Sequence, residues 1–174
     1  HPSLRWTGLT GAATALQVAR AATQAPGPVL LVANDAATAA RLEEELAFFC
    51  ADAVPVFGFP GYETLPYDQF SPHPDIISQR LRTMARLPAL KRGIVIVDLQ
   101  TALQRLPPRT FIDGHALSLK AGEALDLEQF RLRLTSAGYA SVPQVGEPGD
   151  FAIRCSLFDV FPMGSESPLR IDLF

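Results

Sequence analysis

The stretch GLTGAATA, near the start of the sequence, resembles the phosphate-binding loop G-x-x-x-x-G-K-[ST] in outline only. Gly8 occupies the first fixed position. The other fixed positions, which need glycine, lysine and a hydroxyl residue, hold Ala13, Thr14 and Ala15. The glycine lets the backbone approach phosphate oxygens, the lysine balances the outer phosphates, and the hydroxyl binds magnesium. Gly8 and Gly11 can still shape a turn, so the stretch predicts a degenerate loop or an ordinary capped helix start, without nucleotide hydrolysis.

A second candidate is the positive charge concentrated in residues 80–109. Only Asp98 opposes the basic residues of this stretch, which are Arg80, Arg82, Arg86, Lys91, Arg92, Arg105 and Arg109. They could form a track for nucleic-acid phosphates. The alternative is an arginine-rich helix face beside a loop. The net charge of the whole chain is -3, which is not typical of a nucleic-acid-binding protein.

Other chemistry is not indicated. The three histidines are isolated, and the two cysteines, Cys50 and Cys155, lie far apart, so we expect no metal, no cofactor and a reduced, cytoplasmic setting. The glutamates of residues 43–45 point about 100° apart on a helix and cannot converge on one centre. No apolar run approaches the roughly 18 residues that a membrane span needs.

Two late segments place arginines on one side of expected strands. In PLRIDLF, alternation puts Leu169, Ile171 and Leu173 on one face and Arg170, Asp172 and Phe174 on the other. In DFAIRCSLF, the same count groups Ile153, Cys155 and Leu157, with Arg154 opposite them.

If the apolar sets face the core, Arg154, Arg170 and Phe174 point outward. Arginine and aromatic side chains together are typical of protein-binding hot spots. The alternative is that both arginines are scattered surface charges and that Phe174 is covered by chain beyond this sequence.

These residues must be positioned by two kinds of fold. Up to Pro108, apolar strand patterns at residues 28–34, 54–59 and 93–99 alternate with helical patterns at about 11–23, 35–49, 74–87 and 100–106. This order predicts βαβ units and a mostly parallel sheet. We expect Thr10 and Asp35 to cap the first two helices, and the first strand to be covered on both faces.

The pattern changes after Pro108. Alternation in HALSLKAGEAL, a helix over residues 126–139 closed by Gly138, and two later strands predict a smaller α+β module. We therefore place the domains at residues 1–110 and 111–174. The sequence stops within a strand pattern, which indicates a fragment of a longer protein.

Longer stretches carry a family resemblance. YETLPYDQFSPHPDIISQRLRTMARLP, RGIVIVDLQTALQRL, SAGYASVPQVGEPGDFAIR and LFDVFPMGSESPLRIDLF are similar to the N-terminal region of the Mfd family of bacterial transcription-repair coupling factors. The similarity covers nearly all of the chain. That region in turn resembles domains 1a and 2 of the excision-repair protein UvrB, which implies a degenerate P-loop, helicase-like domain followed by a UvrA-binding domain, cut short at its C-terminal end.

The resemblance also implies partners. Members of this family are ATP-dependent DNA translocases that displace stalled RNA polymerase through other domains and recruit UvrA. Their UvrA-contacting positions correspond to Arg154, Arg170 and Phe174, and a C-terminal domain of the full-length protein covers the same surface at rest. The longer tyrosine-rich insertion with which UvrB grips damaged DNA is replaced here by a short loop between Tyr67 and Arg80. The sequence therefore predicts a non-catalytic UvrA-docking module, with DNA binding or residual nucleotide binding as alternatives.

Overall fold

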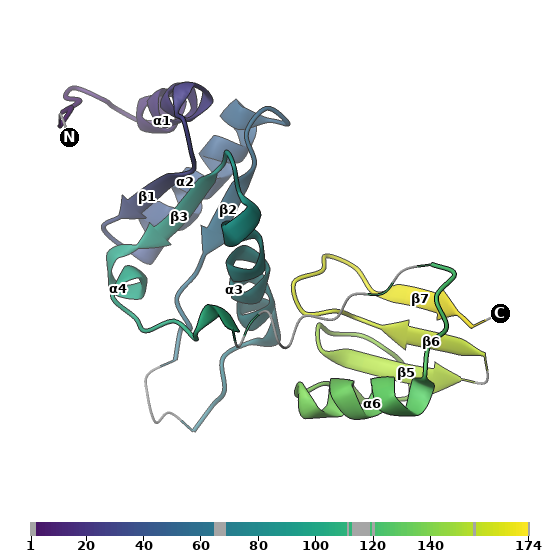
Figure 1. Cartoon of the computed structure of the whole chain (residues 1–174). Helices are drawn as coiled ribbons and strands as arrows, with labels where there is room; N and C mark the ends of the chain where they lie inside the picture. Colours follow the sequence, from purple (N-terminus) through teal and green to yellow (C-terminus); the bar gives the residue numbers. More distant parts are fainter. Residues whose placement is uncertain are drawn as a thin grey trace. The chain divides into compact units, whose positions relative to one another are not determined.

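The computed structural model describes residues 3–64, 69–110, 112, 119, 121–154 and 156–173. These residues form two compact units (Figure 1). The first contains residues 1–61 and 86–104, and the second contains residues 62–85 and 105–174. The helix at residues 74–86 therefore belongs almost entirely to the second unit, although it precedes part of the first unit in the sequence. The domain ranges 1–110 and 111–174 stay a prediction.

Among the described residues of the first unit, three strands form a parallel sheet. The order is β1-β3-β2, with β1 at Val29–Ala33, β2 at Val56–Phe59 and β3 at Ile94–Asp98. The central strand β3 is buried along its whole length, as expected for an apolar run in the middle of a parallel sheet. The mixed α/β character predicted for this part of the chain is confirmed.

A hydrophobic core joins this sheet to helix α1 (Ala13–Gln24) and helix α2 (Ala36–Cys50). Both helices share this core with β1 and β3, and Ala15, Leu46 and Ile94 are fully buried in it. Asp35 caps α2 as predicted, because its Oδ1 accepts the backbone N–H of Thr38 at 2.7 Å.

Three local expectations for the first unit are wrong. Helix α1 begins at Ala13 rather than near Gly11, and Thr10 does not cap it, because a turn at Gly11 separates the two and the capping position falls on Ala12. Strand β1 is not covered on both faces: it is an edge strand, and Leu30 is 64% exposed. The helix expected at residues 100–106 is the short α4, Leu99–Ala102.

The second unit contains a mixed sheet of four strands among its described residues. The order is β4-β5-β6-β7, with β4 at Ala140–Ser141, β5 at Asp150–Arg154, β6 at Leu157–Val160 and β7 at Leu169–Asp172. Strands β5, β6 and β7 are antiparallel neighbours, whereas β4 pairs with β5 in parallel. Most of HALSLKAGEAL lies outside the described residues.

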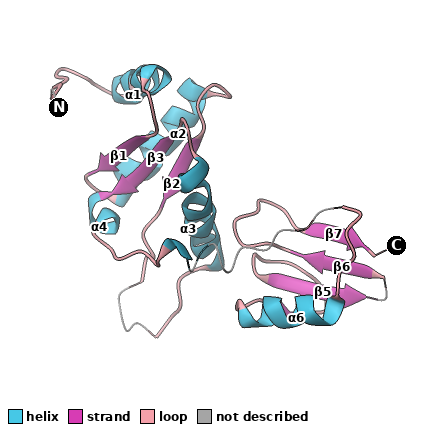
Figure 2. Ribbon diagram, in the orientation of Figure 1, coloured by secondary structure: helices cyan, strands magenta, loops and turns pink. Residues whose placement is uncertain are grey.

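Helix α6 (Leu127–Ser136) lies along one face of this sheet (Figure 2). The core between them contains Phe130 and Leu134 from the helix and Phe151 and Phe158 from the strands. The rings of Phe130 and Phe158 meet edge to face with centroids 5.2 Å apart. Because one face of the sheet is buried in this way, the side chains that alternate with the core residues lie on the opposite face.

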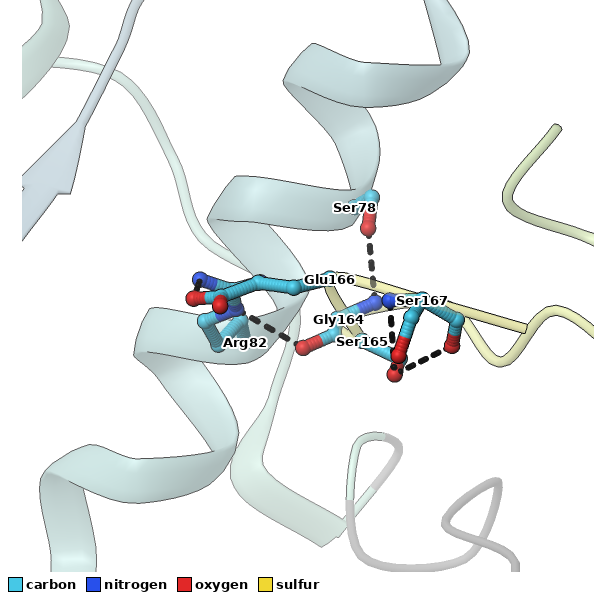
Figure 3. A network of polar contacts seen from close by, with 6 residues as sticks. All are labelled: Ser78, Arg82, Gly164, Ser165, Glu166 and Ser167. Carbon is cyan, nitrogen blue, oxygen red and sulfur yellow. Dashed lines mark hydrogen bonds and ion pairs between the residues drawn. The ribbon is translucent and has the colours of Figure 1, made fainter. Parts of the chain in front are cut away.

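The loop between β6 and β7 is held by helix α3, Pro74–Arg86 (Figure 3). The Ser78 hydroxyl accepts the backbone N–H of Gly164 at 2.7 Å, and Arg82 donates to the Gly164 carbonyl at 2.7 Å. Arg82 also pairs with Glu166 at 2.8 Å. Both backbone groups of Gly164 are therefore bound to the helix, and the loop that leads into β7 is fixed by α3.

We expect Gly164→Ala to destabilise the chain by about 2–4 kcal/mol. Gly164 has φ +85°, where a Cβ costs about 1–2 kcal/mol, and that Cβ would lie 3.2 Å from Cα of Arg82, which adds overpacking. Gly138 is the matched control, because it has φ +87° with nothing within 4 Å of an added Cβ. Urea unfolding of both variants measures the difference, and equal losses would contradict the close packing on α3.

Candidate functional site

The face of the second sheet that points away from α6 carries both predicted arginines. Antiparallel pairing places Ala152 opposite Asp159 and Asp159 opposite Arg170, so these three residues share a face, and Arg154 joins them two residues along β5. Arg154 and Arg170 are both exposed. The outward placement predicted from alternation is confirmed for these two side chains, whereas Phe174 lies outside the described residues.

One residue was assigned to the wrong face. Leu157 does not share a face with Ile153, because the chain turns between them and the pairing places Leu157 opposite Arg154. The count by twos holds within one strand only, and β5 ends at Arg154. Cys155, the third member of that predicted set, lies outside the described residues.

Asp159 is the central group of this face. Its two carboxylate oxygens accept hydrogen bonds from Arg170, with Nε to Oδ1 at 2.6 Å and Nη2 to Oδ2 at 2.8 Å. This bidentate arrangement fixes the plane of the guanidinium as well as its position. The Asp159 side chain is 15% exposed, whereas that of Arg170 is 62% exposed. The Asp159 carboxylate is therefore mostly buried on the sheet surface, whereas the Arg170 side chain extends into solvent.

Arg154 has a different partner. Its Nη2 donates to the backbone carbonyl of Pro143, in the loop before β5. Arg154, Asp159 and Arg170 border a pocket of about 460 Å³. Its lining residues are Gln144, Val145, Arg154, Asp159, Pro168, Leu169 and Arg170. Two guanidinium groups beside apolar side chains can bind a partner that offers carboxylates and an apolar contact.

The hydrogen bonds from Arg170, and the charge of Arg154 beyond it, hold the pKa of Asp159 below its usual value of 3.8. The ion pair therefore contributes its full stability above the unfolded-state pKa and loses it as the pH falls through the lower folded-state value. We expect a carboxyl ¹³C titration of Asp159 to give a midpoint below 3.8 in the native chain. Arg170→Ala should raise that midpoint, and an unchanged midpoint would contradict the pairing.

The stretch GLTGAATA, which the sequence predicts to be a degenerate phosphate loop, leads into α1. Gly8 and Gly11 have φ +74° and +55°, so both serve as turn residues, and an added Cβ at either would meet nothing within 4 Å. Ala15 is fully buried in the helix–sheet core, and Ala13 and Thr14 are half-buried beside it. At Ala15, a position where a working loop presents a hydroxyl to magnesium, this chain has a core residue.

The basic residues of the predicted track do not form one exposed set. Arg80 is buried, with its guanidinium 3.9 Å from the centroid of the Tyr62 ring. Arg82 is bound to the β6–β7 loop, and Arg86 lies 5.7 Å from the centroid of Phe57. Each of these three arginines therefore has a partner within the chain, whereas the alternative considered from the sequence was an arginine-rich helix face beside a loop.

Sequence reasoning missed Asp159 and the loop side of the pocket. The signal was present in LFDVF, where a single acid interrupts an apolar strand between Phe158 and Val160. An acid at such a position must point away from the core, and the hairpin register then brings it to an arginine.

Within the described ranges there is no group of acidic, histidine or cysteine side chains suited to a metal, and no helix there is long and apolar enough to cross a membrane.

The later part of the second unit matches the model of a known protein family. Residues 117–174 match the family of the UvrB interaction domain, which includes β5, β6, β7 and both arginines.

Over almost its whole length the chain is also similar to curated transcription-repair-coupling factors. It is 49% identical over 166 residues, 95% of the chain, to that of Escherichia coli (strain K12). Identity is 40% over 93% of the chain for the factor of Haemophilus influenzae, and 32% over 97% for that of Staphylococcus aureus (strain USA300). The chain spans about 14% of the length of each relative. It is therefore a homologue of one region of transcription-repair-coupling factors, as the sequence resemblance predicted.

Proposed function

We propose that this chain is a docking module that recruits UvrA in transcription-coupled DNA repair and carries out no catalysis itself. The observation that carries the proposal is the outward face of β5, β6 and β7, where Arg154 and Arg170 border one pocket within a UvrB interaction domain. Exposed arginines beside apolar side chains are the composition of a protein-binding centre. Phe174, which follows β7, is proposed as a third contact on the basis of the family resemblance.

The first unit serves in this proposal as a helicase-like fold that has lost its phosphate chemistry. Its parallel sheet and the turn before α1 support the assignment, and the residues at positions 13–15 explain the loss. In the full-length protein, ATP-driven translocation on DNA and displacement of RNA polymerase belong to other domains, and a C-terminal domain masks the arginine face at rest. The whole protein acts in the cytoplasm.

Capture of UvrA by the purified chain tests the proposal. Immobilised wild-type chain should retain UvrA, and Arg170→Ala should retain much less at the same loading. Gln129→Ala, on the exposed side of α6, is the control and should retain UvrA like the wild type, because α6 covers the opposite face of the sheet. Equal retention by the wild type and Arg170→Ala would overturn the assignment of this face.

A further inference from the structure

Asp159 has a position that suggests a role in binding beyond local stability. It lies on β6, between the strands that carry the two arginines, and its neighbours Phe158 and Val160 are 0% and 5% exposed. The carboxylate is therefore attached to a strand whose adjacent residues are buried in the core. Arg170, by contrast, lies on β7, and 62% of its side chain is exposed.

A long exposed arginine would normally sample many rotamers. The two hydrogen bonds that Nε and Nη2 of Arg170 donate to Asp159 engage one edge of the guanidinium and fix its plane. A guanidinium has five N–H donors, and those not directed at Asp159 are both donors of Nη1 and the second of Nη2. The outer end of Arg170 is thus presented to solvent in a defined orientation before any partner arrives.

We propose that Asp159 is a positioning residue for UvrA capture, which orders Arg170 in the free chain so that binding does not have to. This inference rests on the proposed function and extends it to a residue that does not itself need to touch the partner. Immobilising a long side chain on binding weakens association by about 2- to 10-fold, and Asp159 removes that cost in advance. The held arginine also presents a fixed planar edge that suits a partner carboxylate.

Asp159 also affects the binding affinity through its charge, and this effect opposes the gain in affinity from ordering Arg170. Removing a carboxylate makes the face more positive, which strengthens attraction to an acidic partner whether or not Arg170 is ordered. The two effects separate in a double-mutant cycle, because ordering requires Arg170 and the charge effect does not.

The experiment measures the Kd for purified UvrA of four chains: wild type, Asp159→Asn, Arg170→Ala and the double variant. We expect Asp159→Asn to weaken capture about 2- to 10-fold more when Arg170 is present than when residue 170 is alanine. The same change in both backgrounds would overturn the inference, since it would show a charge or packing effect alone. Stronger capture by Asp159→Asn only in the chain with Arg170 would also overturn it, because Asp159 would then compete with the partner.

A second readout needs no partner. In the free chain the Nε–H of Arg170 should exchange slowly with solvent, and Asp159→Asn should speed that exchange while the exchange of backbone amides in β6 is unchanged. Rapid exchange in the wild type would overturn the inference.

If Arg170→Ala does not weaken capture, the proposed function fails and the inference fails with it. If Arg170→Ala weakens capture but the cycle shows no coupling, the inference alone fails.

Discussion

Arg154→Glu is expected to abolish UvrA capture while the chain stays folded. Arg154 is exposed at the end of β5, and its described hydrogen bond goes to a loop carbonyl rather than into the core. Truncating one member of a buried interfacial charge pair weakens binding by at least about 30-fold, and reversing the charge adds repulsion. The loss should appear in a binding titration as no saturation at concentrations that saturate the wild type.

Arg133→Glu is the matched control for this prediction. It makes the same change of charge on an exposed position of α6, which covers the opposite face of the sheet. Circular dichroism should show the same thermal transition for both variants within a few degrees. Normal capture by Arg154→Glu, or equal loss in the control, would contradict a localised docking face.

Phe158→Ala is expected to cost about 3–5 kcal/mol of unfolding free energy. Its side chain is fully buried, and its ring contacts those of Phe130 and Phe151, with centroid distances of 5.2 and 6.0 Å. Because small domains are stable by only about 5–15 kcal/mol, this one truncation removes a large part of the total. Capture should then fail through loss of the sheet that orients both arginines.

The adjacent residue provides the contrast. Asp159→Asn changes the next position along β6 but faces away from the core, so its effect on the midpoint of urea unfolding should be small beside that of Phe158→Ala. Urea denaturation monitored by circular dichroism measures both variants. Similar losses from the two would contradict the division of this strand into a core side and a binding side.

Much of the fold was predictable because its signals are local. The apolar run at residues 93–99 gave the buried strand β3, and Asp35 gave the start of α2. The errors occurred where the local sequence does not determine the structure. Thr10 is a suitable capping residue, but the turn at Gly11 moves the start of α1, and the apolar run at β1 says nothing of its position at the edge of the sheet.

The candidate site was predictable only in part. Alternation within β5 and within β7 correctly placed Arg154 and Arg170 on the outward face. Alternation does not continue through the turn to Leu157, so it assigned that residue to the wrong face. It also could not show that Asp159 lies between the two arginines, since that depends on the register of three strands. The α3 contacts at Gly164 join residues 82 or more positions apart, and no local pattern predicts them.

The most direct test of the docking face is site-specific crosslinking to UvrA. A photoreactive side chain at Gln144, which lines the arginine pocket, should crosslink to UvrA in the native chain. The same group at Gln129, an exposed glutamine on α6, should not. Crosslinks from position 129 but none from position 144 would place the partner on the other face and contradict the account.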